Sequence, residues 1–147
     1  SSDKISGSSF LEEVSDMTDG KLLDMAIQAR KNSYSPYSNF RVGAALLSKS
    51  GKVYTGCNVE NAAYSPTNCA ERTAVFKAVS EGERDFEAIA IVGGKGEEPS
   101  ELCAPCGVCR QVMQEFCKAD FLIYVIGPEG AYDTYTLAQM LPGGFSL

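Results

Sequence analysis

The segment over residues 86–127 reads FEAIAIVGGKGEEPSELCAPCGVCRQVMQEFCKADFLIYVIG. It opens with an apolar run bounded by glycines, FEAIAIVGG (86–94), and closes with another, FLIYVIG (121–127), each typical of a buried strand. Between them, GVCRQVMQEFC (107–117) repeats apolar residues at helical spacing. Strand, helix and strand in this order predict two parallel strands joined by a right-handed crossover, which indicates an α/β domain.

Upstream of this unit, the pattern predicts two helices and a hairpin. TDGKLLDMAIQARK (18–31) repeats apolar residues at helical spacing, and Thr18 offers a cap. RVGAALLSKSGKVYTGC (41–57) contains two short β-rich runs around a polar turn, which is the pattern of a hairpin. CAERTAVFKAVSEG (69–82) predicts a second helix that ends at Gly82.

The tail YDTYTLAQMLPGGF (132–145) predicts an edge strand and one short helix. Together the elements indicate a three-layer α/β/α fold, in which an antiparallel hairpin and parallel strands form a mixed sheet of about five strands, covered by helices. No internal repeat or low-complexity linker interrupts the sequence, so we expect a single domain over residues 1–147. We expect residues 1–9, which are mostly small and polar, to be disordered or derived from a tag.

Charge and hydropathy narrow the range of partners. The chain carries 13 basic and 19 acidic residues, a net charge of -6, without a run of Lys or Arg that could follow a phosphate backbone. We therefore expect no nucleic-acid ligand. No apolar stretch approaches the roughly 20 residues of a membrane helix, and the first residues lack the order of a secretory signal, so we expect a cytoplasmic protein without a membrane partner. Clustered thiols in such a protein favour a metal over disulfides.

Thiols are the candidate metal ligands, because the chain contains no histidine. The six cysteines are Cys57, Cys69, Cys103, Cys106, Cys109 and Cys117. Cys106 and Cys109 are three residues apart at a predicted helix start, where Pro105 fits, so at ~100° per residue their sulfurs should share one face of the first turn. Cys103 precedes the proline, and nothing in the sequence directs its sulfur to the same point.

Cys69 and Glu71 are two residues apart and would face opposite ways inside a helix. We therefore expect the pair to straddle a helix start, so that the carboxyl lies beside a metal held by the thiolate without being a ligand itself. Two helix N-termini would then point at one metal, and their dipoles would offset the negative charge of three thiolates. Arg72 is the candidate to donate hydrogen bonds to the same sulfurs.

The motif C-A-E at 69–71, followed by P-C-x-x-C at 105–109, resembles the zinc-binding pattern of deaminases that act on bases and nucleosides. The likeness extends over about residues 25–145 and includes NFRVGAAL (39–46), GCNVENAAY (56–64), CAERTAVFKAVSEG (69–82), PCGVCRQVMQEF (105–116) and LPGGF (141–145). In these motifs the chain resembles the small homotetrameric cytidine deaminases whose zinc ligands are all cysteines. It departs from that family at Ala104, where a serine is expected, and Cys103 is an extra thiol.

This resemblance implies zinc-dependent hydrolytic deamination of cytidine and 2′-deoxycytidine to the uracil nucleosides, with release of ammonia, in pyrimidine salvage. It implies one zinc ion per chain on Cys69, Cys106 and Cys109, which would supply hydroxide for attack on C4 while Glu71 shuttles protons. It also implies a homotetramer with shared active sites. The substrate-binding residues that it implies are Phe40 at the base, Asn58 and Glu60 at the ribose, Ala70, and Tyr64 and Phe145 toward a neighbouring subunit.

Three other kinds of protein stay open at this stage. Cys103 could join the three ligands in a closed, non-catalytic Cys₄ zinc module. The C-x-x-C-x-x-C run also suggests an iron-sulfur cluster, although that pattern needs a fourth cysteine where Met113 stands. Deaminases of another free nucleoside or base share the metal motifs, but Asn58 with Glu60 argues for an intact ribose.

Overall fold

The computed structural model describes residues 20–99 and 101–147. Its strands are β1 (Arg41–Ser48), β2 (Val53–Cys57), β3 (Phe86–Gly94), β4 (Leu122–Ile126) and β5 (Tyr132–Thr136). They form one five-stranded sheet in the order β2-β1-β3-β4-β5. β3 and β4 pair in parallel, whereas the other neighbouring strands pair antiparallel. The predicted hairpin, the parallel pair and the mixed sheet are confirmed.

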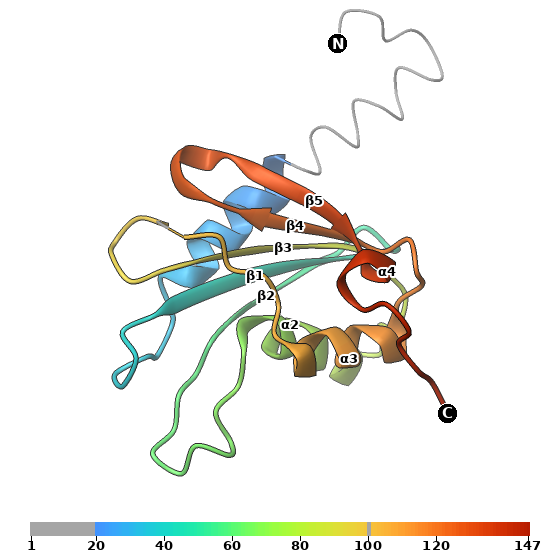
Figure 1. Ribbon diagram of the computed structural model, residues 1–147, viewed down its shortest axis with the longest axis horizontal. Coiled ribbons are helices and arrows are strands. Elements are labelled where there is room, and N and C mark those ends of the chain that lie inside the picture. Colours follow the sequence, from blue (N-terminus) through green and yellow to red (C-terminus); the bar gives the residue numbers. More distant parts are fainter. Residues whose placement is uncertain (1–19, 100) are drawn as a thin grey trace, which may run out of the picture.

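Helices cover both faces of this sheet (Figure 1). α2 (Ala70–Ser80) and α3 (Gly107–Phe116) lie on one face, and the helix over residues 20–30 lies on the other. A 3₁₀ turn, η1 (Pro128–Gly130), joins β4 to β5, and α4 (Leu137–Met140) follows β5. The three-layer arrangement is therefore confirmed. The predictions for Thr18 and for residues 1–9 lie outside the described residues.

Each face of the sheet has its own apolar core. Leu46, Ile89 and Met113 pack between the sheet and the helices α2 and α3, and each is at most 1% exposed. Leu22 and Ala45 belong to the second core, beneath the helix over residues 20–30. Burying a large aliphatic side chain contributes about 1.5–3 kcal/mol to folding. Because both faces are covered, β3 is a continuous apolar run rather than an alternating one.

Two glycines let helices approach the hairpin closely. A Cβ atom on Gly43 would lie 2.2 Å from the carbonyl oxygen of Ala26, and one on Gly56 would lie 2.5 Å from that of Ala70. The Thr73 hydroxyl strengthens the second contact by donating to the carbonyl of Cys57 at 3.0 Å. Because Ala70 is the first residue of α2, the contact at Gly56 fixes where that helix starts relative to the sheet.

The end of α2 agrees with the prediction from the sequence. Glu81 is the C-cap, and Gly82 beyond it has a φ of +95°, a left-handed conformation that favours glycine. Within the described part of the chain, no helix has both the length and the apolar character needed to cross a membrane.

Candidate active site

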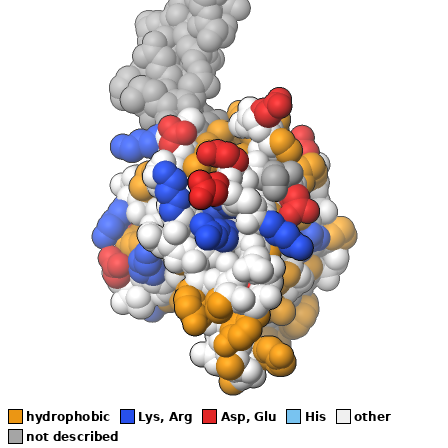
Figure 2. All heavy atoms as spheres, turned by 90° about the vertical axis from the view of Figure 1, so that its left-hand side faces the viewer, with side chains coloured by type: hydrophobic (Ala, Val, Ile, Leu, Met, Phe, Trp, Pro, Cys, Tyr) orange, Lys and Arg blue, Asp and Glu red, His pale blue; other side chains and the backbone are white. Residues whose placement is uncertain are grey.

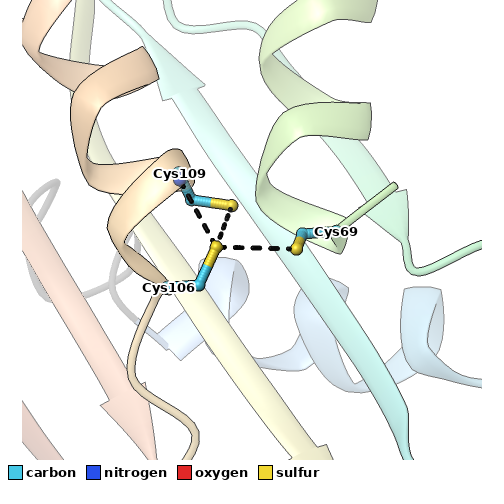
Figure 3. A group of neighbouring side chains, drawn as sticks. All are labelled: Cys69, Cys106 and Cys109. Carbon is cyan, nitrogen blue, oxygen red and sulfur yellow. Dashed lines mark hydrogen bonds between the residues drawn. The ribbon is translucent and has the colours of Figure 1, made fainter. Parts of the chain in front are cut away.

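Three cysteine thiols meet where two helices begin (Figure 3). Cys69 is the N-cap of α2 and Cys106 is the N-cap of α3, both with extended backbone. The Cys69 and Cys106 sulfurs are 3.8 Å apart, and those of Cys106 and Cys109 are 3.4 Å apart. All three sulfurs lie within 4.8 Å of one another. The structure thus brings together the three predicted metal ligands from two distant parts of the sequence.

The local reason for this convergence differs from the predicted one. Cys106 does not share the first turn with Cys109, because α3 begins at Gly107 and Pro105 precedes the cap. Instead, the Cys106 thiol folds over the helix start and accepts a hydrogen bond from the Cys109 N–H at 3.5 Å. An N-cap side chain commonly accepts from the N–H three residues on, so the cap itself brings the two sulfurs together.

The donor set fits a zinc ion. Tetrahedral zinc with Zn–S bonds of about 2.3 Å places its sulfur ligands about 3.8 Å apart. The separations between the Cys69 and Cys106 sulfurs, 3.8 Å, and between the Cys106 and Cys109 sulfurs, 3.4 Å, fall close to that value. Among the described residues, Cys103 is not a member of the sulfur group, so three thiols converge rather than four. The same observation disfavours the closed Cys₄ module and the iron-sulfur cluster, both of which need a fourth thiol.

Arg72 lies next to the sulfurs, as predicted. Its Nη2 donates to the Cys69 sulfur at 3.3 Å. Hydrogen bonds from Cys109, and then from Arg72 and Cys106, lower the pKa of Cys69 to about 5, although partial burial opposes the shift. The hydrogen bond with Cys69 in turn raises the pKa of Arg72. This group therefore favours a thiolate at Cys69, the protonation state that a metal requires.

Glu71 occupies the first turn of α2 and is 4% exposed. Burial raises the pKa of its carboxyl to about 7. A carboxyl with a pKa near neutrality can both accept and donate a proton at physiological pH. The predicted position of Glu71, beside the thiols but outside the ligand group, agrees with the structure.

A cavity of about 230 Å³ opens beside the thiols. Seven of the predicted site residues line it: Phe40, Asn58, Glu60, Cys69, Ala70, Glu71 and Cys106. The other four, Cys109, Arg72, Tyr64 and Phe145, do not. Larger cavities lie elsewhere, among them one of about 400 Å³ beside Arg41 and one of about 510 Å³ beside η1, but none of the three clustered sulfurs lines them. The smaller cavity is therefore the candidate substrate site.

Tyr64 and Phe145 lie outside this cavity and are strongly exposed, at 78% and 65%. Tyr64 belongs to the segment over residues 59–66, which projects from the domain at the lower left of Figure 1. On the face seen in Figure 2, hydrophobic side chains gather on the lower, projecting part, below a region of mixed charge. Within one chain, the structure does not bring these two aromatic residues to the site.

The sequence does not predict two features of the site. The first is that Cys103 lines the cavity, where burial raises the pKa of its thiol to about 12. A Cβ atom on Gly93 would lie 2.8 Å from the Cys103 Cβ and 3.0 Å from the Phe40 ring, so this glycine leaves space for two cavity walls. The only signal in the sequence is the Gly-Gly pair that ends β3, which by itself indicates a strand boundary.

A second missed feature is the segment before β1. Ser33 donates a hydrogen bond to the Asn58 side chain, and Ser38 donates one to the Glu60 carboxylate. The polar segment SYSPYSN (33–39) contains Pro and Asn, which signal a turn and carry no information about distant partners.

The fold and the thiol group together define an α/β/α domain in which three thiols could hold a metal ion and a buried carboxyl lies beside them. Comparison with known proteins agrees: the model of the cytidine and deoxycytidylate deaminase zinc-binding region matches residues 16–125. The chain belongs to this family of hydrolytic deaminases, which confirms the predicted family and enzyme class.

Individual relatives support the assignment. The cytidine deaminase of Sporosarcina psychrophila is 52% identical over 126 residues, covering 86% of this chain and 90% of that protein. The cytidine deaminase of Halalkalibacterium halodurans is 52% identical over 125 residues, covering 85% and 92%. A crystal structure of cytidine deaminase from Burkholderia pseudomallei matches with a TM-score of 0.80 at 46% identity, covering 88% of this chain and 100% of that one.

Proposed function

We propose that this chain catalyses the zinc-dependent hydrolytic deamination of cytidine and 2′-deoxycytidine, forming uridine and 2′-deoxyuridine and releasing ammonia. The observation that carries the proposal is a buried carboxyl, Glu71, in the wall of the same cavity as the clustered thiols of Cys69 and Cys106. The names of the relatives, cytidine deaminases at 52% identity, support the choice of substrate.

Cys69, Cys106 and Cys109 would hold one zinc ion per chain. When bound with an open position, zinc lowers the pKa of a water molecule to near neutrality and so supplies a nucleophile. Arg72, which donates to the Cys69 sulfur, and the N-terminal ends of α2 and α3 offset part of the negative charge of the thiolates.

Glu71 is the group that moves protons. Deamination adds the water oxygen to C4 of the ring while N3 gains a proton. The bond between C4 and the exocyclic nitrogen then breaks, the amine leaves with a further proton as ammonia, and C4 keeps the oxygen as a carbonyl. Glu71 can accept the first proton of the water and pass it to N3. It can then take the remaining proton from the hydroxyl on C4 and deliver it to the amine, because its pKa of about 7 allows transfer in both directions.

The other walls of the cavity would bind the nucleoside. Phe40 would pack on the base, and Asn58 and Glu60 would bind the ribose with an amide and a carboxylate. Ala70, at the first position of α2 and in the wall of the same cavity, would also contact the substrate.

The proposal includes a homotetramer with shared active sites. The exposure of Tyr64 and Phe145 supports it, because two aromatic residues that do not reach the cavity of their own chain are free to approach that of a neighbour. A role in pyrimidine salvage follows from the substrate. The cytoplasm is the proposed compartment, since all six cysteines are free thiols.

The experiment compares the wild type with Glu71→Gln. We expect about one zinc per chain in both proteins, ammonia release from cytidine by the wild type, and a loss of kcat of about 100-fold or more in the variant. Glu87→Gln, at an exposed position near the start of β3, is the matched control and should keep its activity. Turnover that survives in Glu71→Gln, or zinc that is lost from it, would contradict the assigned role.

A further inference from the structure

The carboxylate of Glu60 is held by the segment that precedes β1. The backbone N–H groups of Tyr37 and Ser38 donate to its Oε1 at 2.9 Å and 3.1 Å. The Ser38 hydroxyl donates to its Oε2. The hydrogen bond from the Ser38 hydroxyl is also the main cause that lowers the pKa of Glu60. The carboxylate is therefore ionised at neutral pH and fixed through both of its oxygens.

The amide of Asn58 is held by the start of β1. Its Nδ2 donates to the carbonyl of Phe40 at 2.8 Å, and its Oδ1 accepts from the N–H of Val42 at 2.9 Å. The Ser33 hydroxyl donates to the same Oδ1. If the amide were flipped, its NH₂ group would face the Val42 N–H and its oxygen would face the Phe40 carbonyl. The hydrogen bonds therefore fix the orientation of the amide.

The Ser38 hydroxyl connects the two halves of this network. It accepts a hydrogen bond from the N–H of Phe40 at 3.0 Å while it donates to Glu60. The intervening Asn39 has a φ of +59°, the left-handed region that asparagine tolerates better than most residues, and this lets the chain turn back on itself. The backbone of Phe40 is thus bound at its N–H through Ser38 and at its carbonyl by Asn58.

The hydrogen-bonding capacity that remains is small and specific. A carboxylate offers about four acceptor sites, and three of those on Glu60 are taken, so one remains on Oε2. The amide of Asn58 uses both acceptor sites of its oxygen and one of its two N–H donors, so one donor remains. One acceptor and one donor in the wall of the same cavity complement a hydroxyl group, which donates once and accepts as well.

We infer that Ser38 is a positioning residue for recognition of the sugar, which aligns the Glu60 carboxylate with a substrate hydroxyl and ties it to the backbone of Phe40 at the base. The inference rests on the proposed function and adds a residue to it. Ser38 does not touch the reacting atoms. A serine that only stabilised a turn would affect every substrate equally, whereas a positioning role requires that its effect depend on the sugar hydroxyls.

The test is a double-mutant-type cycle, in which one change removes the Ser38 hydroxyl from the protein and the other removes the ribose hydroxyls from the substrate. Wild type, Ser38→Ala and Ser38→Thr are assayed as zinc-loaded enzymes with cytidine and with 2′,3′-dideoxycytidine, which lacks both ribose hydroxyls. For cytidine, we expect Ser38→Ala to raise KM about fivefold with kcat within about twofold of the wild type, because one charge-assisted hydrogen bond is lost. For the dideoxynucleoside, KM should be unchanged, and Ser38→Thr should restore the wild-type values for both substrates.

Ser80→Ala is the matched control, since this serine donates to the Lys77 carbonyl at the end of α2, away from the cavity. If Ser38→Ala does not fold, Ser38→Cys gives the same comparison with a weak donor of similar size. An equal change in KM for both nucleosides, or no change for either, would overturn the inference. The proposed function fails separately, and takes the inference with it, if the zinc-loaded wild type releases no ammonia from either nucleoside.

Discussion

Cys103 and Cys109 belong to the same short segment, yet their thiols have different surroundings. Cys109 is 1% exposed and lies in the sulfur group with Cys69 and Cys106. Cys103 instead packs beside Gly93 and lines the cavity. Position relative to the start of α3 separates them, because Cys109 lies within the first turn and Cys103 precedes the proline that leads into the helix.

Because of this difference, replacing each cysteine by serine should change the zinc content of the protein differently. Cys109→Ser should lose most of its zinc, because two thiols and a hydroxyl bind the ion far more weakly than three thiols. Cys103→Ser should keep about one zinc per chain, since its sulfur is outside the group. The zinc content of the purified variants tests both expectations. Cys117→Ser, at a partly buried cysteine outside the sulfur group, is the control. Zinc loss in Cys103→Ser would indicate a closed Cys₄ site and contradict the proposed chemistry.

At the scale of residues, the sequence predicted the ligands and the carboxyl but not the groups that hold the substrate residues. Ligand chemistry depends on short spacings such as C-x-E and C-x-x-C, which a sequence displays directly. The bond from Ser38 to Glu60 joins residues 22 positions apart. Only the pairing of chain segments in the fold brings these two together, and no local pattern encodes it.

At the scale of elements, the turn of the hairpin is tied to the end of α2. The hydroxyls of Ser48 and Ser50 donate to the Glu83 carboxylate at 2.8 Å and 2.6 Å. Lys52, in the same turn, forms an ion pair with Glu81 at 3.0 Å. The tip of the hairpin therefore anchors the far end of the helix whose start carries Cys69.

Stability should depend on pH through Glu83. The hydrogen bonds from Ser50 and Ser48 lower the pKa of this carboxyl below its ordinary value, because they favour the charged form. A lowered folded-state pKa contributes stability that is present above the unfolded-state pKa and is lost as the pH falls through the folded one. We therefore expect Glu83→Gln to be less stable than the wild type at pH 7, with the difference shrinking between about pH 5 and pH 3.

Urea unfolding at several pH values measures this difference. Glu115→Gln, which removes an exposed carboxylate from α3, is the matched control for the loss of one surface charge. A difference in the free energy of unfolding that stays constant from pH 7 to pH 3 would contradict the assigned hydrogen bonds.

The elements themselves were largely predictable, because apolar runs and helical periodicity are local signals. Each predicted strand and helix within the described residues is present, and the strand pair around the crossover is parallel. The pairing of β1 with β3 was not predictable in this way. This pairing depends on contacts between distant segments, and a local pattern does not contain them. One such contact is the close approach of the helix over residues 20–30 to Gly43 in β1.

At the scale of the molecule, the sheet makes the site possible. It places the starts of α2 and α3 side by side on one face, although Cys69 and Cys106 are separated by a whole strand in the sequence. Three sulfurs then converge while the buried Glu71 remains outside the group. We propose that this arrangement leaves one coordination position of the zinc ion open to water, next to a carboxyl that transfers protons.

X-ray absorption at the zinc K edge of the zinc-loaded protein would show whether that position is open. We expect three sulfur neighbours at about 2.3 Å and one oxygen or nitrogen neighbour at about 2.0 Å. A shell of four sulfurs in the wild type would mean that protein ligands close the site, whether or not the Cys103→Ser variant loses one of them. The proposed reaction would then have no coordination position for its water.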